Sequence, residues 1–193
     1  MVLVIDTSSG RSALALVGQD GTLAQDVIAA RREHHLPART RALADPGLLT
    51  AVAVSLGPGS FTGLRVGVSY GVGLAMGLGV PLLGLGSLDL QAARACEPAT
   101  ALVEAGRGRL YWQEPGGEPG LGEPAELPAG LPAVGWLEEA TAAAVRAAGR
   151  RLLGDRELAG FAEAAAALLG RAPELGYDTV KLKYMQSFRT VQE

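Results

Sequence analysis

Two short polar stretches, each directly after an apolar run, contain the side chains that could act on a phosphate group. Asp6, Thr7 and Ser8 follow the run 2–5, and a carboxylate with neighbouring hydroxyls is suited to a nucleotide phosphate or its magnesium ion. The Gly-Pro-Gly-Ser turn at 57–60 follows the run 51–54 and precedes a predicted helix, whose first backbone N–H groups could bind an anion. The candidate nucleotide or anion contacts are therefore Asp6, Thr7, Ser8, Gly57, Gly59 and Ser60.

Neither stretch is a complete catalytic motif. Phe61 and Thr62 stand where a phosphate-binding loop would need its lysine and its hydroxyl residue. Asp6 is equally suited to capping a turn. Ser60 is the one residue of the turn that could serve a hydrolase as nucleophile. The residues alone thus leave ligand binding, phosphoryl transfer and hydrolysis open.

Metal chemistry is poorly supported, because the chain has two histidines, His34 and His35, and one cysteine, Cys96. Adjacent side chains on a helix do not share a face, so a two-histidine metal motif at a spacing of four cannot form. A single cysteine allows neither an internal disulfide nor a cysteine metal cluster. We predict no metal site and no catalytic residue, and interpret the histidines as a partly solvated helix entrance.

Composition limits the class of protein. With 193 residues, 48% of them hydrophobic, the chain can bury a sizeable core in one domain or two small lobes. A net charge of -3 does not indicate a general nucleic-acid-binding surface. The first residues contain neither a basic region nor an apolar signal core, so we expect no signal peptide. The composition, with its single cysteine, predicts a cytoplasmic protein. An uncharged run between Arg65 and Asp89 is long enough to cross a bilayer, but Pro81 and several glycines interrupt it, so we expect no membrane span.

The element that must position both polar stretches is a helix predicted over 61–77, with Ser60 as its N-cap. Glycines recur in it every fourth residue, and each costs about 1 kcal/mol relative to alanine inside a helix. Such a bare stripe lets another backbone approach closely, and the other faces are apolar, so we expect the helix to be covered on two sides. We predict that a partner or a second copy covers one side through Gly63, Leu64, Val66, Gly67, Tyr70, Gly71 and Leu74. The alternative is that Gly67 faces the protein's own sheet.

The remaining elements predict an α/β fold, a mixed sheet with helices in two lobes. The first lobe, 1–97, begins with three short strands that form an antiparallel meander and then alternates helices and strands. Its expected elements are strands 2–5, 12–17, 23–29, 51–55 and 80–85, and helices 37–44, 61–77 and 88–96. The second, reduced lobe, 98–193, has expected strands 100–104 and 109–113, a loop-rich segment 114–135 with one edge strand, helices 136–150 and 156–169, and a basic-aromatic tail 177–193 that either frays or orders on a partner.

Three stretches together resemble the TsaB (YeaZ) family. They are Val-Ile-Asp-Thr-Ser at 4–8, Gly-Pro-Gly-Ser-Phe-Thr-Gly-Leu-Arg-Val-Gly at 57–67, and residues 107–112. Members of this family take part in making threonylcarbamoyladenosine, the modified base beside the anticodon of certain tRNAs. The resemblance implies an actin-like, ribonuclease-H-like fold of two lobes, similar to sugar kinases and Hsp70 ATPase domains. It covers the first lobe firmly and the second loosely.

The resemblance also implies partners. A paralogous enzyme of the TsaD (Gcp) family would perform the transfer, a TsaE-like ATPase would belong to the same complex, and the chain would form a homodimer in isolation. The chain departs from the family pattern in the short segment 34–50 and in Glu104-Ala105-Gly106-Arg107, which replaces the usual Asp-Ala-Arg. It also lacks the paired histidines with which the catalytic paralogue is expected to hold a metal.

Two hypotheses of function follow. The first is a non-catalytic partner or scaffold subunit for a TsaD-like enzyme, with ATP or ADP held, if at all, at an interface shared with that enzyme. The alternative is an independent actin-like ATPase or small-molecule kinase that uses Asp6, Thr7 and the Gly57 turn. Phosphoryl transfer needs cations at the phosphates, and Arg65 is the one cation near either stretch, which favours the first hypothesis. The acidic net charge predicts little direct contact with tRNA.

Overall fold

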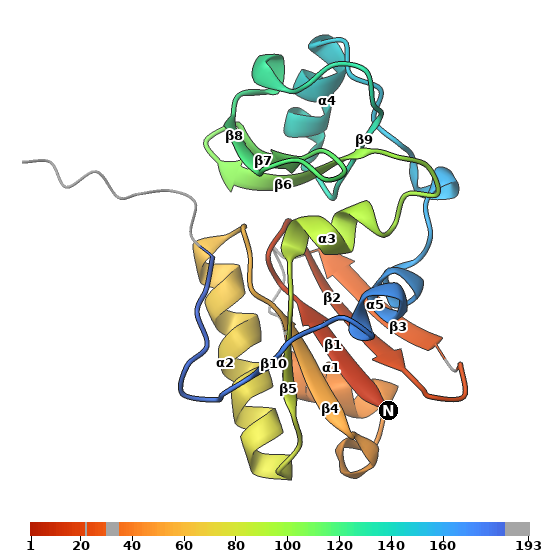
Figure 1. The fold of residues 1–193 in the computed structure, drawn as a ribbon, viewed down its shortest axis with the longest axis vertical. Coiled ribbons are helices and arrows are strands. Elements are labelled where there is room, and N and C mark those ends of the chain that lie inside the picture. Colours follow the sequence, from red (N-terminus) through yellow and green to blue (C-terminus); the bar gives the residue numbers. More distant parts are fainter. Residues whose placement is uncertain (22, 30–34, 184–193) are drawn as a thin grey trace, which may run out of the picture.

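The computed structural model describes residues 1–21, 23–29 and 35–183 (Figure 1). His34 and residues 184–193 of the basic-aromatic tail lie outside the described residues. Among the described residues, no helix combines the length and the apolarity that a bilayer crossing would require.

A six-stranded mixed sheet forms the larger part of the molecule, in the order β10-β5-β4-β1-β2-β3. Strands β1, β2 and β3 pair antiparallel as the predicted meander, β4 and β5 add parallel to β1, and β10 pairs antiparallel with β5. The bounds are β1 Val2–Asp6, β2 Arg11–Val17, β3 Leu23–Ala29, β4 Ala51–Ser55, β5 Leu82–Leu85 and β10 Glu174–Leu175. Central strands β1 and β4 are apolar up to their last residues, Asp6 and Ser55, because both of their faces are buried.

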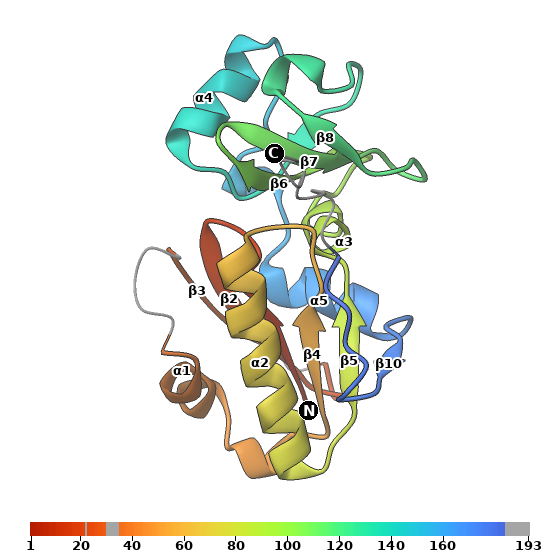
Figure 2. The same cartoon turned by 90° about the vertical axis from the view of Figure 1, so that its left-hand side faces the viewer.

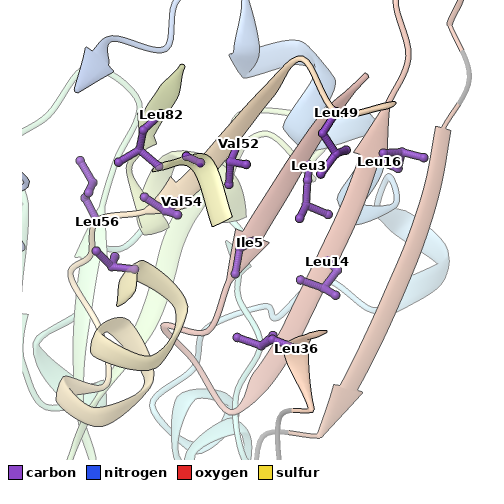
Figure 3. Packing of buried hydrophobic residues seen from close by; sticks show 12 residues of the cluster. Leu3, Ile5, Leu14, Leu16, Leu36, Leu49, Val52, Val54, Leu56 and Leu82 are labelled. Carbon is purple, nitrogen blue, oxygen red and sulfur yellow. The ribbon is translucent and has the colours of Figure 1, made fainter. Parts of the chain in front are cut away.

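Helices cover both faces of this sheet (Figure 2). Helices α1 (Leu36–Leu43) and α2 (Phe61–Leu78) lie on one face, and α3 (Ser87–Ala92) and α5 (Phe161–Leu169) lie on the other. Because side chains alternate along a strand, Leu3 and Ile5 point into the core beneath α2, which Figure 3 shows, while Val4 joins the core around Phe161.

A second, four-stranded sheet, β8-β7-β6-β9, lies beyond the carboxyl ends of β1 and β4 (Figure 1). Its strands are β6 Thr100–Gly106, β7 Arg109–Gln113, β8 Gly120–Gly122 and β9 Ala133–Val134, and α4 (Glu139–Ala147) packs on it through Val145. The loop-rich segment 114–135 was expected to contain one edge strand, but it provides both edges of this sheet, β8 and β9. Arg107 at the β6–β7 turn has a φ of 53° and stands between two glycines that also have positive φ.

The chain returns to the six-stranded sheet after the second one. Helix α5 packs on β2 and β3, and β10 pairs with β5, although the sequence placed both segments in a second lobe that runs from 98 to 193. We therefore propose that residues 161–175 be counted with the first lobe. The helix predicted over 156–169 begins only at Phe161, after Gly160 as its N-cap, and the helix predicted over 88–96 ends at Ala92.

The glycine stripe of α2 packs on the protein's own sheet. An added Cβ would lie 1.9 Å from the Thr7 carbonyl oxygen at Gly63, and 2.2 Å from Thr7 Oγ1 at Gly67. At Gly71 it would lie 2.2 Å from Val54 Cγ1. Close packing against β1 and β4 thus offsets the cost of these glycines in the helix. Gly63, Leu64, Gly67 and Gly71 are buried and cannot meet a partner, so assigning them to an interface was wrong.

Candidate functional site

A cleft of about 450 Å³ separates the two sheets. The loop after β1 and the start of α2 form one wall, and the β6–β7 hairpin with Glu138 forms the other. The lining residues are Ser8, Ser9, Gly10, Gly59, Ser60, Phe61, Thr62, Glu104, Ala105, Gly106, Tyr111 and Glu138. Three of the candidate contacts, Ser8, Gly59 and Ser60, therefore face the cleft, while Asp6, Thr7 and Gly57 do not line it.

Asp6 is fully buried beneath the wall of the cleft. Its Oδ1 accepts a hydrogen bond from Ser8 N at 2.9 Å, and its Oδ2 has no hydrogen-bond partner among the described residues. Burial raises the pKa of the Asp6 carboxyl above its usual value, and the contacts with Ser8 and Ser55 oppose that rise. The turn-cap interpretation of Asp6 thus agrees with its geometry, and a ligand in the cleft does not reach its carboxylate without a local opening.

Thr7 and the glycine turn hold β1 and α2 together. Thr7 Oγ1 donates to the Gly63 carbonyl oxygen at 2.6 Å, and Ser60 N donates to the Ser8 carbonyl oxygen at 2.7 Å. Ser60 Oγ accepts from Gly63 N at 3.2 Å, which confirms Ser60 as the N-cap. At Gly59 a Cβ would lie 2.3 Å from the Ser8 carbonyl oxygen, so only glycine allows this approach. The Ser60 and Gly63 amides therefore already donate to acceptors inside the protein.

The electrostatics of the cleft are unfavourable for a phosphate. The charged residues among those lining it are Glu104 and Glu138, and Glu104 Oε1 accepts from Glu138 N at 3.0 Å. No lysine or arginine is among the described residues that line it. The Arg65 guanidinium lies 3.7 Å from the centre of the Phe61 ring, in a cation–π contact at the entrance of α2. The cleft therefore lacks the protein cations that stabilise phosphoryl transfer.

The outer face of α2 has a different character. Met76 is 57% exposed and Phe61 is 41% exposed, and a Cβ added at Gly73 or Gly77 would meet nothing within 4 Å. Val66, Tyr70 and Leu74 are half-buried at the border of this face, and the Tyr70 hydroxyl donates to Thr40 Oγ1 at 2.9 Å. The two exposed glycines weaken the helix without any packing inside the described chain to offset the cost.

The comparisons with known proteins agree with the resemblance. Residues 28–123 match the model of a family described as TsaD, tRNA N6-adenosine threonylcarbamoyltransferase. The tRNA threonylcarbamoyladenosine biosynthesis protein TsaB of Escherichia coli is 34% identical over 125 residues, 58% of this chain and 54% of that protein. TsaB of Bacillus subtilis is 32% identical over 120 residues, 57% of this chain and 52% of that protein. The chain is thus similar to TsaB proteins over a little more than half of its length.

The chain spans about half the length of these curated TsaB relatives. The solved structure of YeaZ from Pseudomonas aeruginosa superposes with a TM-score of 0.74 at 21% identity, over 95% of this chain and 99% of that one. The predicted fold class, an actin-like mixed α/β arrangement, is thereby confirmed.

Several features of the site and of α2 were not predicted from the sequence. Glu138 was placed inside a helix predicted over 136–150, but α4 begins only after it. Ser69, Gly73 and Gly77 form a second stripe of small residues at a spacing of four, which the sequence does contain. Ser69 also lies in a Gly-x-Ser-x-Gly pattern at 67–71, but it is in the middle of α2 and not at a strand-to-helix turn, so the pattern is not a nucleophile elbow.

Proposed function

We propose that this chain is a non-catalytic partner subunit of a TsaD-like enzyme in the threonylcarbamoylation of tRNA adenosine beside the anticodon. The names of its TsaB relatives support a role in that pathway. The observation that carries the partner role is the outer face of α2, where exposed Gly73 and Gly77 stand beside exposed Met76.

The physical argument concerns the cost of these glycines. Each exposed glycine destabilises a helix interior by about 1 kcal/mol relative to alanine. At Gly63, Gly67 and Gly71, close packing on the sheet offsets this loss of helix stability, but Gly73 and Gly77 have no such contact. Close packing by a helix from another subunit would offset the loss at these two positions. Because a TsaD-like paralogue has a related fold, one patch can pair either with that enzyme or with a second copy of this chain.

The cleft supports the non-catalytic part of the proposal. Its two glutamates repel a triphosphate, and the described lining residues contain no compensating cation. ATP or ADP at the shared interface would therefore depend on cations that the partner supplies. The net charge of -3 supports little direct contact with tRNA. A TsaE-like ATPase in the same complex and a cytoplasmic location belong to this proposal as well.

Reconstitution tests the proposal. The chain, its TsaD-like paralogue, a TsaE-like ATPase with ATP and unmodified tRNA are combined with a threonylcarbamoyl donor, with the chain or the paralogue left out in the controls. The modified nucleoside is measured by mass spectrometry. We expect modification only when both proteins are present, and no ATP turnover by the chain alone. Modification by the paralogue alone at the same rate contradicts the partner role. ATP turnover by the chain alone at about 1 per second or faster supports the ATPase alternative instead.

A matched pair of variants connects the result to α2. Met76→Glu places a charge on the outer face of α2, while Leu23→Glu places the same charge on an exposed apolar residue of edge strand β3. We expect Met76→Glu to reduce modification in the reconstituted system and Leu23→Glu to leave it unchanged. Equal effects of both variants would mean that the outer face of α2 has no special role.

A further inference from the structure

A second cavity, of about 230 Å³, lies on the face of the six-stranded sheet opposite α2. Its lining comes from β2 and β3, from the segment after α3, from the connections that precede α4 and α5, and from the first residue of α5. Its lining residues are Arg11, Gln25, Val27, Arg94, Trp136, Asp155, Leu158, Ala159, Gly160 and Phe161. Unlike the cleft between the sheets, it contains two arginines.

The Arg94 guanidinium is buried beside this cavity and has few hydrogen-bond acceptors. The residue is 5% exposed, and its guanidinium lies 4.4 Å from the centre of the Trp136 ring. Its Nη1 donates to Gln91 Oε1 at 3.0 Å, while its Nε has no hydrogen-bond partner among the described residues. Burial lowers the pKa of Arg94 to about 10, and Arg11 lowers it further, while Asp155 opposes the shift. A buried guanidinium with unused donors is costly unless a further acceptor is present.

Neither Arg11 nor Asp155 provides the hydrogen-bond acceptor that the buried Arg94 guanidinium lacks. Asp155 lies 3.9 Å from Arg11 Nη2 and 3.8 Å from Arg94 Nη2, so its carboxylate is beyond hydrogen-bond distance of both. The Asp155 side chain is 73% exposed, which weakens its attraction to either cation. Within the described residues the Arg11 guanidinium donates no hydrogen bond, and it lies 5.7 Å from the Trp136 ring centre. Two guanidiniums thus share one exposed carboxylate.

The side-chain amide of Gln25 adds an uncharged hydrogen-bond donor to the cavity. Gln25 Oε1 accepts a hydrogen bond from Ala162 N at 2.9 Å, which fixes the amide and leaves its NH2 group for another acceptor. Trp136 packs on Phe161, with ring centres 5.6 Å apart, so its ring is a rigid platform for both arginines. The donors around the cavity therefore outnumber the acceptors that the described residues provide.

We propose that this cavity binds a small oxyanion, a phosphate or carboxylate group of a small molecule, which bridges Arg11 and Arg94 beside the Trp136 ring. The planar guanidinium fork is suited to bidentate contact with either group. The site lies on the face of the sheet opposite α2, so it is independent of the proposed partner surface. It also stands apart from the cleft between the sheets, whose charged lining residues are acidic.

Trp136 fluorescence can report binding in a Trp112→Phe background, because the chain has two tryptophans. Sodium phosphate, or sodium acetate as the carboxylate probe, is titrated against sodium chloride at constant ionic strength. We expect a saturable response to at least one of the two probes. Arg11→Gln should weaken the apparent affinity about tenfold or more, since it removes a charge-assisted contact. Circular dichroism verifies the fold of each variant.

Two further variants separate a site from a general effect of charge. Arg146→Gln removes the same charge from an exposed position on α4 and should leave the affinity unchanged. Asp155→Asn removes the competing carboxylate and should tighten binding. Saturation by phosphate alone, acetate alone or both identifies the group that the site accepts and supports the proposal. A response that is not saturable, or equal affinities in Arg11→Gln and Arg146→Gln, overturns it.

Discussion

Two glycine-to-alanine substitutions on the same helix should change stability in opposite directions. Gly63 and Gly73 both lie in α2, but Gly63 packs on β1 and Gly73 faces outward. A Cβ at Gly63 would lie 1.9 Å from the Thr7 carbonyl oxygen, a backbone atom that cannot rotate away. A Cβ at Gly73 would meet nothing within 4 Å. The pair therefore isolates close packing from helix propensity.

The magnitudes follow from these contacts. In Gly63→Ala, α2 must move away from β1, and such overpacking costs about 1 to 3 kcal/mol. The movement also weakens the buried hydrogen bond from Thr7 Oγ1 to the Gly63 carbonyl oxygen, worth about 1 kcal/mol. The gain in helix propensity returns up to about 1 kcal/mol. We expect Gly63→Ala to lower the free energy of unfolding by about 2 kcal/mol, and Gly73→Ala to raise it by about 0.5 to 1 kcal/mol.

Urea unfolding followed by circular dichroism measures both values, at one protein concentration and with the slope of each transition compared. Gly67→Leu should lower the free energy of unfolding by more than Gly63→Ala, because its Cβ would meet Thr7 Oγ1 and a leucine is larger than an alanine. If Gly63→Ala is as stable as Gly73→Ala, the reasoning about the inner stripe is refuted.

Two further predictions concern buried polar groups. Burial raises the pKa of Asp6, so stability falls as pH rises from the unfolded value, about 4, through the raised native value. Asp6→Asn removes this loss of stability. The melting temperature of the variant should exceed that of the wild type at pH 7, and the two should become similar towards pH 4. A melting temperature below that of the wild type at every pH contradicts the argument. Arg39 donates to Asp26 Oδ2 and Ser12 Oγ, at 2.6 and 2.8 Å, and joins α1 to β2 and β3. Arg39→Lys should lower the free energy of unfolding by about 2 kcal/mol in urea, and an unchanged midpoint would show that the guanidinium geometry is unimportant.

Strands β1 to β5 of the larger sheet were predictable because their sequence pattern is local, whereas the two-residue strand β10 was not predicted. The runs at 2–5 and 51–55 are continuous and apolar, and the structure has strands Val2–Asp6 and Ala51–Ser55 there. Ser60 was predictable as the N-cap of α2 because serine is among the residues preferred at the N-cap of a helix.

The orientation of α2 was not predictable in the same way. Its sequence contains two stripes of small residues, one through Gly67 and one through Gly73, and periodicity does not say which faces the sheet. The contact of Gly67 with Thr7, far away in sequence, decides it. Trp136 was likewise predicted to be helical, but packing against Arg94 and Phe161 holds it in an extended connection before α4. Tertiary contacts overrode a weak local preference at both places.

The association of the chain with its TsaD-like paralogue tests the partner role most directly. Analytical ultracentrifugation would compare the dissociation constants of the wild type, Met76→Glu and the control Leu23→Glu, with the fold of each verified by circular dichroism. We expect the wild type and Leu23→Glu to bind alike, and Met76→Glu to bind at least about tenfold more weakly, since a charge would be buried at the interface. Equal binding by all three proteins, or no association of the wild type, would contradict the account.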